Sequence, residues 1–416
     1  MAARHHKEKS HPNEYLFKGY DMCYGSWLTA GGMHPGRTGL KYLWIPFCVL
    51  SPMFMVILVI TCLQALSQEK KDLGLASEII HFVVFLVIEL TIILSFSFQT
   101  SKVDFIYRTV GQDFYDYLGT MDKKTCLEIR KLSLESERKI RILARIFIWM
   151  FIGAYVTAVY LRPVFKYYQE EHLTGTPDDG MHSLLIVTLW LPFNKYNFWS
   201  NFVFYILEFF VGTWSLPLCL SHNLFVLSVC EKLCISLRML GLGLRRLNER
   251  VAALPDLPRR EALRICLRHS IRHHQLIIRM VKDYEDIIFY PALVFVGSGG
   301  VLLCMCFFLF MSDEVSIIAK VVFLFFLISE LIAAFIYCSC GEKIKTFSGE
   351  IHEEIFAADW INDSATLKSY IIIVTVRARK GLIVSAGGFM SLSHETFGNM
   401  LSSAFSYFNL MIAASK

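Results

Sequence analysis

Charged residues are absent from long stretches of this chain. Hydrophobic residues make up 55% of its 416 positions, and the mean hydropathy is +0.47. A soluble protein would arrange its apolar residues as amphipathic stripes, but here they gather in long uncharged runs. The lack of charge therefore excludes an ordinary soluble domain and predicts an all-α membrane protein.

Seven of these runs have the length of a membrane span. Roughly 20 helical residues at 1.5 Å each cover the ~30 Å hydrocarbon core of a bilayer. The third run is short, but Arg145 and Arg162 flank it and can extend their charged ends towards the interface. We expect seven transmembrane helices, at about 42–66, 77–99, 146–161, 201–229, 287–311, 317–340 and 396–412.

Lysine and arginine are sparse on one side of these spans. Most of the 41 lie in four segments, 1–41, 100–145, 230–285 and 342–391. The positive-inside rule then places the N-terminus in the cytoplasm and, because the number of spans is odd, the C-terminus outside the cell. A signal peptide is not expected, since residues 1–40 contain no short apolar core.

One apolar segment near the C-terminal end carries too much charge to be a span. Arg377, Arg379 and Lys380 sit in the middle of residues 370–384, and basic residues at a helix centre cost several kcal/mol in lipid. We expect residues 342–391 to form amphipathic anchor helices under the membrane. The alternative is an eighth span, which would put the C-terminus inside.

The long loop before span five has a helical pattern of its own. Leucines at spacings of three and four extend helix four to about Val251, and Pro255 and Pro258 break it. Residues 261–283 then predict an amphipathic helix that leads into span five. Within span five, three glycines would allow another helix to approach closely: Gly297, Gly299 and Gly300.

Motifs of several other protein classes are missing. No phosphate-binding loop, zinc-hydrolase motif or nucleophile elbow is found, so the sequence does not support an enzyme. No internal repeat is visible, which argues against inverted-repeat transporters. None of the 12 cysteines falls in an expected outer loop, so no disulfide framework is indicated. A nucleic-acid partner is not expected.

Three clustered histidines raise the question of a metal site: His269, His273 and His274. No acidic or thiol partner lies at helical spacing from them, as such a site would require. We expect them to form part of a basic, partly solvated face of a cytoplasmic helix. No metal or cofactor is predicted.

Carboxylates inside the expected spans need partners, because ionisable groups are costly in lipid. Glu89 and Glu330 are expected to hydrogen-bond to neighbouring helices. Glu208 lies in the outer third of span four. It is a candidate polar anchor for a ligand.

The last expected span has a polar stripe. It contains no Asp, Glu, Lys or Arg, yet four residues recur at spacings of four, three and four and so share one helical face: Asn399, Ser403, Ser406 and Leu410. Lipid cannot satisfy hydroxyl and amide groups, so this face must meet protein or water. The stripe therefore either lines something or packs against other helices.

Six short motifs follow one another in residues 337–416. They are Tyr337-Cys338-x-Cys340-Gly341, Ala357-Ala358-Asp359-Trp360, Arg377-x-Arg379-Lys380, Ala386-Gly387-Gly388, Leu392-Ser393-x-Glu395-Thr396-Phe397 and Ser406-Tyr407-Phe408-x-Leu410. In order and spacing they are similar to the C-terminal region of insect odorant receptors. Upstream, the resemblance is limited to span count, topology and length. The Thr-Tyr and Gln-Phe ending of the related gustatory receptors is absent.

The resemblance implies an odorant-tuned subunit, because the family's co-receptor is longer, with an extra cytoplasmic insertion between spans four and five. It implies a heterotetramer with the odorant co-receptor that forms a non-selective cation channel, opened by a small volatile organic ligand. The channel would lie in the plasma membrane, in olfactory sensory neuron dendrites.

The same resemblance gives each segment a role. The chain would consist of a cytoplasmic segment (1–41), spans one to four with the ligand pocket (42–229), a cytoplasmic helical loop (230–286), spans five and six (287–341), anchor helices (342–391) and a pore-lining helix (392–416).

For the pore, the resemblance implies that permeant cations pass along Asn399, Ser403 and Ser406, with an apolar gate at Leu410. A second apolar position falls on Ala414, which is smaller than the family's usual residue. Uncharged dipoles along the path suit weak selectivity among cations.

For the ligand, the resemblance implies a pocket in the outer halves of spans two, three, four and six. The matching residues are Phe82, Phe85, Leu86, Tyr155, Val159, Tyr205, Glu208, Phe209, Thr213, Phe323 and Phe326. A mostly aromatic cage would bind small apolar volatiles by burial. The alternative is that these side chains face lipid or pack between helices.

Three other classes remain as alternatives. A gustatory-type receptor channel is the nearest and would differ in ligand class and in its need for the co-receptor. A G-protein-coupled receptor would have an outer N-terminus, an outer disulfide and a D-R-Y signature after span three, none of which this sequence predicts. A transporter would show coupled flux without single-channel currents.

Overall fold

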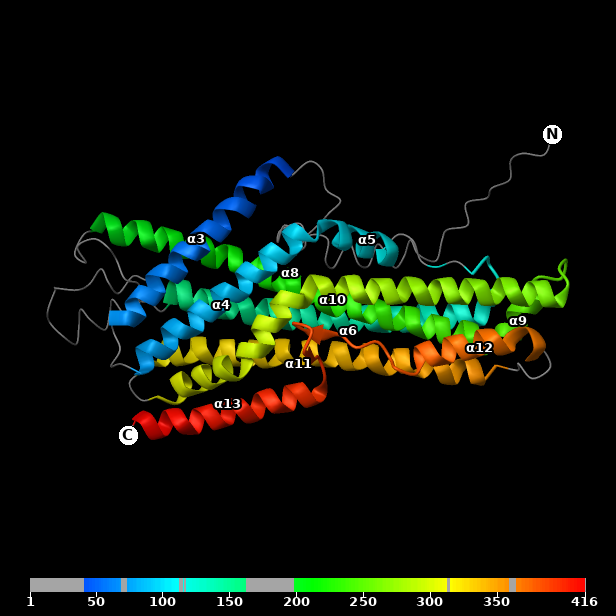
Figure 1. Cartoon of the computed structure of the whole chain (residues 1–416). Coiled ribbons are helices and arrows are strands. Elements are labelled where there is room, and N and C mark those ends of the chain that lie inside the picture. The colour runs from blue at the N-terminus through cyan, green and yellow to red at the C-terminus, as the bar shows by residue number, and fades with distance from the viewer. Residues whose placement is uncertain are drawn as a thin grey trace.

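The computed structural model describes residues 41–68, 73–111, 115, 117–161, 198–312, 315–358 and 364–415. These residues are mostly helical (Figure 1). In chain order the helices are α3 (Lys41–Gln68), α4 (Leu73–Phe98), α5 (Thr100–Gly111), α6 (Lys123–Val156), the π-helical turn η3 (Thr157–Leu161), α8 (Phe198–Arg245), α9 (Leu247–Ala252), α10 (Arg259–Met311), α11 (Ile317–Phe356), α12 (Ser364–Ala378) and α13 (His394–Ser415). The expected segment before residue 41 and the expected outer loop at 162–197 lie outside the described residues.

Five described helices are long and apolar enough to cross a membrane: α3, α4, α8, α10 and α11. Helix α6 with η3 occupies the place of the third expected span, and α13 that of the seventh. Both are more polar than those five helices. The N-terminal part of α6 contains several basic residues, and α13 carries the polar stripe. The mostly helical fold is confirmed, while the number of spans and their orientation stay predictions.

Three helices are much longer than a bilayer is thick. Helices α8, α10 and α11 contain 48, 53 and 40 residues, which is about 60–80 Å at 1.5 Å per residue. The hydrocarbon core measures only ~30 Å. The three pack against one another, and in Figure 1 they extend well beyond α4 towards the end where α9 and α12 lie. One bundle therefore carries both the apolar spans and the region expected in the cytoplasm.

The helix break before α10 falls where the prolines predicted it, whereas the break at Arg246 between α8 and α9 was not predicted. Helix α8 ends at Arg245, α9 continues to Ala252, and α10 begins at Arg259 directly after Pro258. This confirms the expected extension of helix four and the amphipathic helix that leads into span five. Helix α11, in contrast, runs through the expected segment boundary at residue 341 and ends only at Phe356.

Glycines allow the segment after α12 to lie close against the long helices. A short hairpin pairs β1 (Ser385–Ala386) with β2 (Met390–Ser391), and its turn contains Gly387 and Gly388 with φ of 64° and 81°. Residues with a side chain rarely adopt such angles. A Cβ at Gly341 of α11 would lie only 2.2 Å from the backbone oxygen of Leu392. Residues 381–391 are thus a loop and hairpin, and the expectation of helices throughout 342–391 is wrong for this part.

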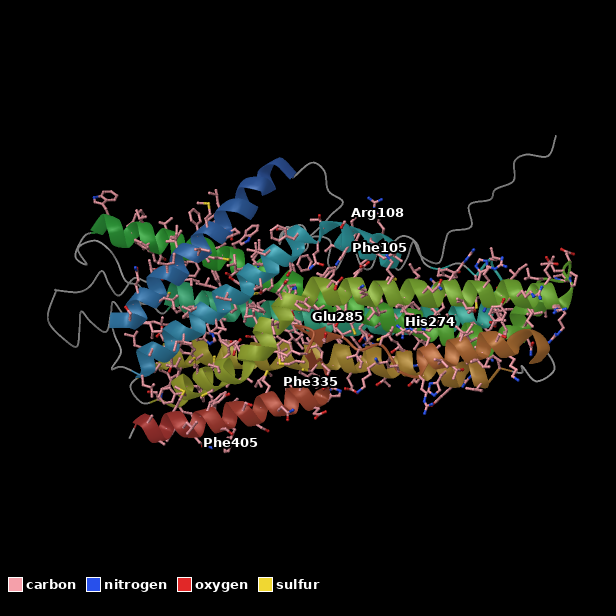
Figure 2. The ribbon with its side chains drawn as sticks, viewed as in Figure 1. Phe105, Arg108, His274, Glu285, Phe335 and Phe405 are labelled. Carbon is pink, nitrogen blue, oxygen red and sulfur yellow. The ribbon has the colours of Figure 1, made fainter. Side chains whose placement is uncertain are left out.

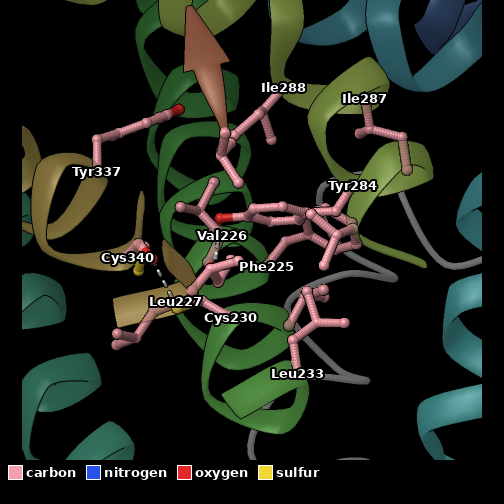
Figure 3. Close-up of a cluster of buried hydrophobic side chains, with 14 of the residues drawn as sticks. Phe225, Val226, Leu227, Cys230, Leu233, Tyr284, Ile287, Ile288, Tyr337 and Cys340 are labelled. Carbon is pink, nitrogen blue, oxygen red and sulfur yellow. Dashed lines mark hydrogen bonds between the residues drawn. The ribbon is translucent and has the colours of Figure 1, made fainter. Parts of the chain in front are cut away.

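The core of the bundle lies between α8, α10 and α11. Tyr284 of α10 is 1% exposed, and its hydroxyl donates to the Val226 carbonyl of α8 at 3.1 Å. The Cys230 thiol of α8 donates to the Cys340 carbonyl of α11 at 3.5 Å. Figure 3 shows these side chains packed with Ile288 and other apolar residues. Apolar packing and these cross-helix bonds hold the three long helices together.

Candidate functional site

A small, partly open cavity of ≈ 50 Å³ lies where five helices meet. Its walls come from α4, α6, α8, α10 and α11, which are far apart in the sequence, and they are mostly apolar and aromatic. The lining residues are Phe85, Ile88, Ile92, Phe151, Cys219, His222, Asn223, Phe295, Leu302, Phe326, Ser329, Glu330, Ala333 and Tyr337. Apolar walls with a few polar groups are typical of a small-molecule site.

Two buried polar atoms of residues in this wall have no hydrogen-bond partner among the described residues: His222 Nδ1 and Asn223 Oδ1. The other ring nitrogen of His222 bonds to the Tyr337 hydroxyl. The Asn223 amide group donates to the Cys219 carbonyl at 2.9 Å. Buried polar atoms are normally satisfied, and both of these atoms are buried, so a bound molecule would reach them only after wall side chains move. The Asn223 oxygen can only accept, so it suits a ligand with a hydroxyl or N–H group.

The cavity is small in this conformation. At ≈ 50 Å³ it has room for a few water molecules, because each needs roughly 10–15 Å³ by this kind of measure. Sites for drug-sized ligands measure about 300–1,000 Å³. Phe85 and Phe326 form part of the wall, with ring centroids 6.2 Å apart. A molecule the size of a volatile requires wall side chains such as these to move.

Four of the eleven pocket residues predicted from the sequence line this cavity or contact a residue that does. Phe85 and Phe326 line it. Phe82 and Phe323 contact Phe326, with ring centroids 6.1 and 6.3 Å away, and Leu86 is buried in the core. This group joins α4 to α11.

The other predicted pocket residues gather between α6 and α8. The hydroxyls of Tyr155 and Thr213 are hydrogen-bonded. The Tyr205 and Phe209 rings have centroids 6.5 Å apart. None of these four lines the cavity, and the side chain of Val159 lies outside the described residues. The predicted pocket thus separates into two groups, of which only the first reaches the cavity.

The carboxylates behave largely as expected. Glu89 of α4 accepts hydrogen bonds from the Ser215 hydroxyl of α8 at 2.6 Å and from a neighbouring thiol. Glu330 of α11 accepts from the Cys306 thiol of α10 at 3.7 Å. The predicted bonds of these two groups to neighbouring helices are confirmed. Glu208 is buried in α8, outside the cavity wall, so its role as a ligand anchor stays a prediction.

Helix α13 lies along one edge of the bundle (Figure 1). Leu410 is 67% exposed, and Phe405, labelled in Figure 2, is 66% exposed. Ser403 is half-buried towards α10. The rest of the predicted polar stripe is exposed in this chain: Asn399, Ser406, Leu410 and Ala414. Most of the stripe therefore does not pack against other helices of the same chain.

Two glycines bring α10 against α13. A Cβ at Gly300 would lie 3.2 Å from the Cβ of Ser403, and a Cβ at Gly299 would lie 2.2 Å from the Met400 sulfur. The predicted use of these glycines for close helix approach is confirmed. Leu302, two residues further along α10, lines the cavity. One stretch of α10 therefore touches the cavity and the last helix.

A buried arginine holds together the other end of the bundle. Arg250 of α9 is 1% exposed. It donates to the backbone oxygens of Gly243 and Cys266 at 2.9 and 3.2 Å and to the Ser270 hydroxyl at 2.9 Å. Its guanidinium lies over the Tyr117 ring, 4.4 Å from the centroid. This group connects α8, α9 and α10 to the segment before α6.

The expected solvated histidine face is wrong for His273 and His274, which are buried. Tyr115 stacks on His273 with ring centroids 4.6 Å apart, and the Tyr117 hydroxyl is hydrogen-bonded to it. Helical spacing shows that such residues share a face but not that a distant segment covers it. Only His269 of the three belongs to the periphery of this group, where it bonds to Tyr115.

Burial keeps both inner histidines neutral. Desolvation, with smaller contributions from His274 and Arg250, lowers the pKa of His273 to about 3. Desolvation and the charge of Arg377 lower the pKa of His274 to about 4. His274 is labelled in Figure 2 on α10, between the neighbouring helices. At neutral pH neither ring carries the positive charge that the sequence pattern suggested.

Comparisons with known sequences give one consistent family. The model of the family described as 7tm Odorant receptor matches residues 116–405. Odorant receptor 23a of Drosophila melanogaster is 20% identical over 242 residues, which cover 55% of this chain and 59% of that protein. The odorant receptor coreceptor of Anopheles gambiae is 22% identical over 152 residues, covering 36% of this chain and 31% of that protein. The matches thus span less than two thirds of these relatives.

A comparison with solved structures gives the same fold over nearly the whole chain. The insect olfactory receptor OR5 from Machilis hrabei, solved in complex with eugenol, superposes with a TM-score of 0.79 at 13% identity. The superposition covers 97% of this chain and 99% of that one. At this identity the likeness establishes the fold alone.

Proposed function

The chain belongs to the odorant receptor family, and from that premise we propose that it is the odorant-tuned subunit of a ligand-gated, non-selective cation channel. It works in the plasma membrane of olfactory sensory neuron dendrites, as a heterotetramer with the odorant co-receptor. Seven helices cross the membrane, with the N-terminus inside and the C-terminus outside. The distribution of lysine and arginine supports this orientation.

The observation that carries the proposal is the cavity among five helices, with two unsatisfied polar atoms on its lining residues. An apolar volatile enters it by displacing Phe85 and Phe326, and its hydroxyl donates to the Asn223 oxygen. Burial of a ligand with ~300 Å² of apolar surface yields several kcal/mol at roughly 25 cal/mol per Å². After the costs of binding, this supports roughly micromolar affinity. The ligand class is therefore a small, mostly apolar molecule with one hydrogen-bond donor.

Helix α10 passes the signal to the pore. Leu302 lines the cavity, and Gly300, on the same stretch of helix, contacts Ser403 of α13. A ligand that pushes α10 outwards moves it against α13, because packed helices shift as rigid bodies. In the tetramer the exposed stripe of α13 faces the central pore. Leu410 forms an apolar gate from which water is expelled in the closed state.

The test is whole-cell current during application of a volatile panel, with G-protein signalling blocked. Eugenol belongs in the panel because the solved relative was determined in complex with it. Cells express this chain alone and then with the co-receptor. Odorant-evoked cation current only with the co-receptor is expected. Tastant responses without the co-receptor, or solute flux without channel currents, would instead favour a gustatory-type receptor or a transporter.

Two matched variants decide which group of predicted residues holds the ligand. Asn223→Leu removes the unsatisfied acceptor in the cavity wall, while Thr213→Val removes a hydroxyl from the separate α6–α8 group. We expect Asn223→Leu to raise the half-maximal concentration of a hydroxylated odorant about tenfold, as expected for one hydrogen bond of roughly 1.4 kcal/mol. Thr213→Val should leave it unchanged. The opposite result would place the ligand between α6 and α8.

A further inference from the structure

Three titratable side chains from three helices meet inside the bundle: His81 of α4, Cys306 of α10 and Glu330 of α11. One donor atom from each lies within 4.8 Å of the others. His81 Nε2 lies 3.5 Å from a Glu330 carboxylate oxygen. The Cys306 sulfur lies 3.3 Å from His81 Nδ1 and 3.7 Å from the other Glu330 oxygen. Nitrogen, sulfur and oxygen donors thus lie close together, with the two His81 nitrogens facing Cys306 and Glu330 respectively.

The His81 side of this group is buried among aromatic rings. His81 is 0% exposed, and its ring contacts Phe82, Phe323 and Phe326, with centroids 5.8, 5.9 and 5.2 Å away. Its Nε2 atom is buried and makes no hydrogen bond among the described residues, its near neighbour being the Glu330 carboxylate oxygen at 3.5 Å. A buried polar atom without a partner is uncommon and calls for an explanation, such as an ion.

The donor set matches zinc. Zn²⁺ takes imidazole nitrogen, thiolate sulfur and carboxylate oxygen at about 2.0–2.3 Å. The edges of a tetrahedron of such bonds measure roughly 3.3–3.7 Å. Only one His81 nitrogen can bind a single ion, and one donor atom from each of the three residues lies within 4.8 Å of the others. Small side-chain rotations would therefore bring the three donors to zinc distances. Magnesium and calcium avoid thiolates, and copper(I) avoids carboxylates. The charge also fits: one thiolate and one carboxylate balance the two charges of the ion, so the occupied site is neutral inside the membrane.

We infer that His81, Cys306 and Glu330 form a Zn²⁺ site that clamps α4, α10 and α11 together. Binding releases the thiol proton of Cys306 and, where Glu330 is protonated, its carboxyl proton, because zinc binds the deprotonated forms. Three protein ligands leave one coordination position for water or another small ligand. The clamp lies next to the cavity, since Glu330 also lines it.

The test uses the purified full-length chain in lipid nanodiscs, stripped of metal with a chelator. Co²⁺ replaces Zn²⁺ as a visible probe, because a cobalt–thiolate bond gives a charge-transfer absorption band that histidine and carboxylate ligands do not give. We expect one Co²⁺ per chain with this band, and displacement of the band by Zn²⁺. Cys306→Ser should abolish the band. Cys304→Ser, which removes a buried thiol two residues away on α10, should keep it.

A second pair of variants covers the case in which Cys306→Ser fails to fold. Glu330→Gln should weaken Zn²⁺ binding at least about tenfold, whereas Glu89→Gln, at a buried carboxylate elsewhere on α4, should not. No band in the wild-type chain, a band that survives Cys306→Ser, or unchanged affinity in Glu330→Gln would overturn the site. Zinc held elsewhere in the chain by histidines alone would give no thiolate band that depends on Cys306. No odorant is used, so a negative result leaves the proposed channel function standing.

Discussion

The contact between Gly341 and Leu392 predicts a large difference between two glycine substitutions in the same helix. A Cβ at Gly341 would lie 2.2 Å from the Leu392 backbone oxygen and 2.5 Å from the Leu392 Cβ. A backbone atom cannot rotate away, so the segment before α13 must shift. At Gly349, also in α11, nothing lies within 4 Å of an added Cβ. Gly341→Ala and Gly349→Ala therefore differ in contacts but share the gain in helix propensity.

The magnitude follows from overpacking. Forcing one extra carbon into a tight contact costs about 1–3 kcal/mol. Leu392 holds its place through a 2.9 Å hydrogen bond from its N–H to the Val384 carbonyl. If Gly341→Ala lowers the opening free energy of this segment by that amount, amide exchange there speeds up about 5- to 150-fold.

The assay is hydrogen–deuterium exchange with mass spectrometry on peptides that cover residues 382–393. Gly341→Ala should show the faster exchange, and Gly349→Ala should exchange at the wild-type rate in the same peptides. Equal protection in the two variants would refute the close approach of Leu392 to α11. Glycine at position 341 would then have no steric requirement behind it.

Three further predictions test other parts of the molecule. Arg250→Met should lower the free energy of unfolding by about 2–4 kcal/mol, since it leaves buried acceptors without a charged donor. Arg259→Met at the surface should change this free energy by less than about 0.5 kcal/mol, and denaturant unfolding of the two variants measures both. The folded pKa values of His273 and His274 are lowered, so their stabilising effect is full well above pH 6.5 and declines as pH falls below it. After correction for the slower intrinsic exchange of amides at lower pH, the opening free energy of residues 115–121, which cover His273, should fall by about 1.4 kcal/mol between pH 7.5 and 5.5, and His273→Gln should reduce this dependence. Leu410→Thr should raise the current without odorant several-fold by wetting the gate, while Leu401→Thr on the opposite face of α13 should not; equal baseline currents in recordings of the two would count against Leu410 as the gate.

Much of the fold could be predicted because its signals are local. Apolar run length gave the positions of the long helices, and Pro258 marked the start of α10. Gly299 and Gly300 indicated a close helix contact, although not that α13 was the partner. The buried carboxylates Glu89 and Glu330 predicted cross-helix bonds, because lipid offers such groups no hydrogen-bond partner.

The cavity could not be predicted because its walls come from five helices. His222 and Asn223 were a usable signal, since polar residues in the middle of an apolar span need partners, but only the fold shows that two of their atoms lack one. His273 was misjudged for a similar reason. Tyr115 and Tyr117, which cover it, are more than 150 positions away in the sequence. Spacing along one helix carries no information about such a contact.

Helix α10 runs unbroken from Arg259 to Met311. This continuity limits which insertions and deletions the protein can tolerate. One inserted residue rotates everything beyond it by about 100° around the helix axis. An insertion near His273 would turn Leu302 away from the cavity, Gly300 away from α13 and Cys306 away from Glu330 in a single step. Insertions and deletions among related receptors should therefore be excluded from this stretch and collect in the connections outside it. An alignment of many relatives would show α10 as the longest block without gaps.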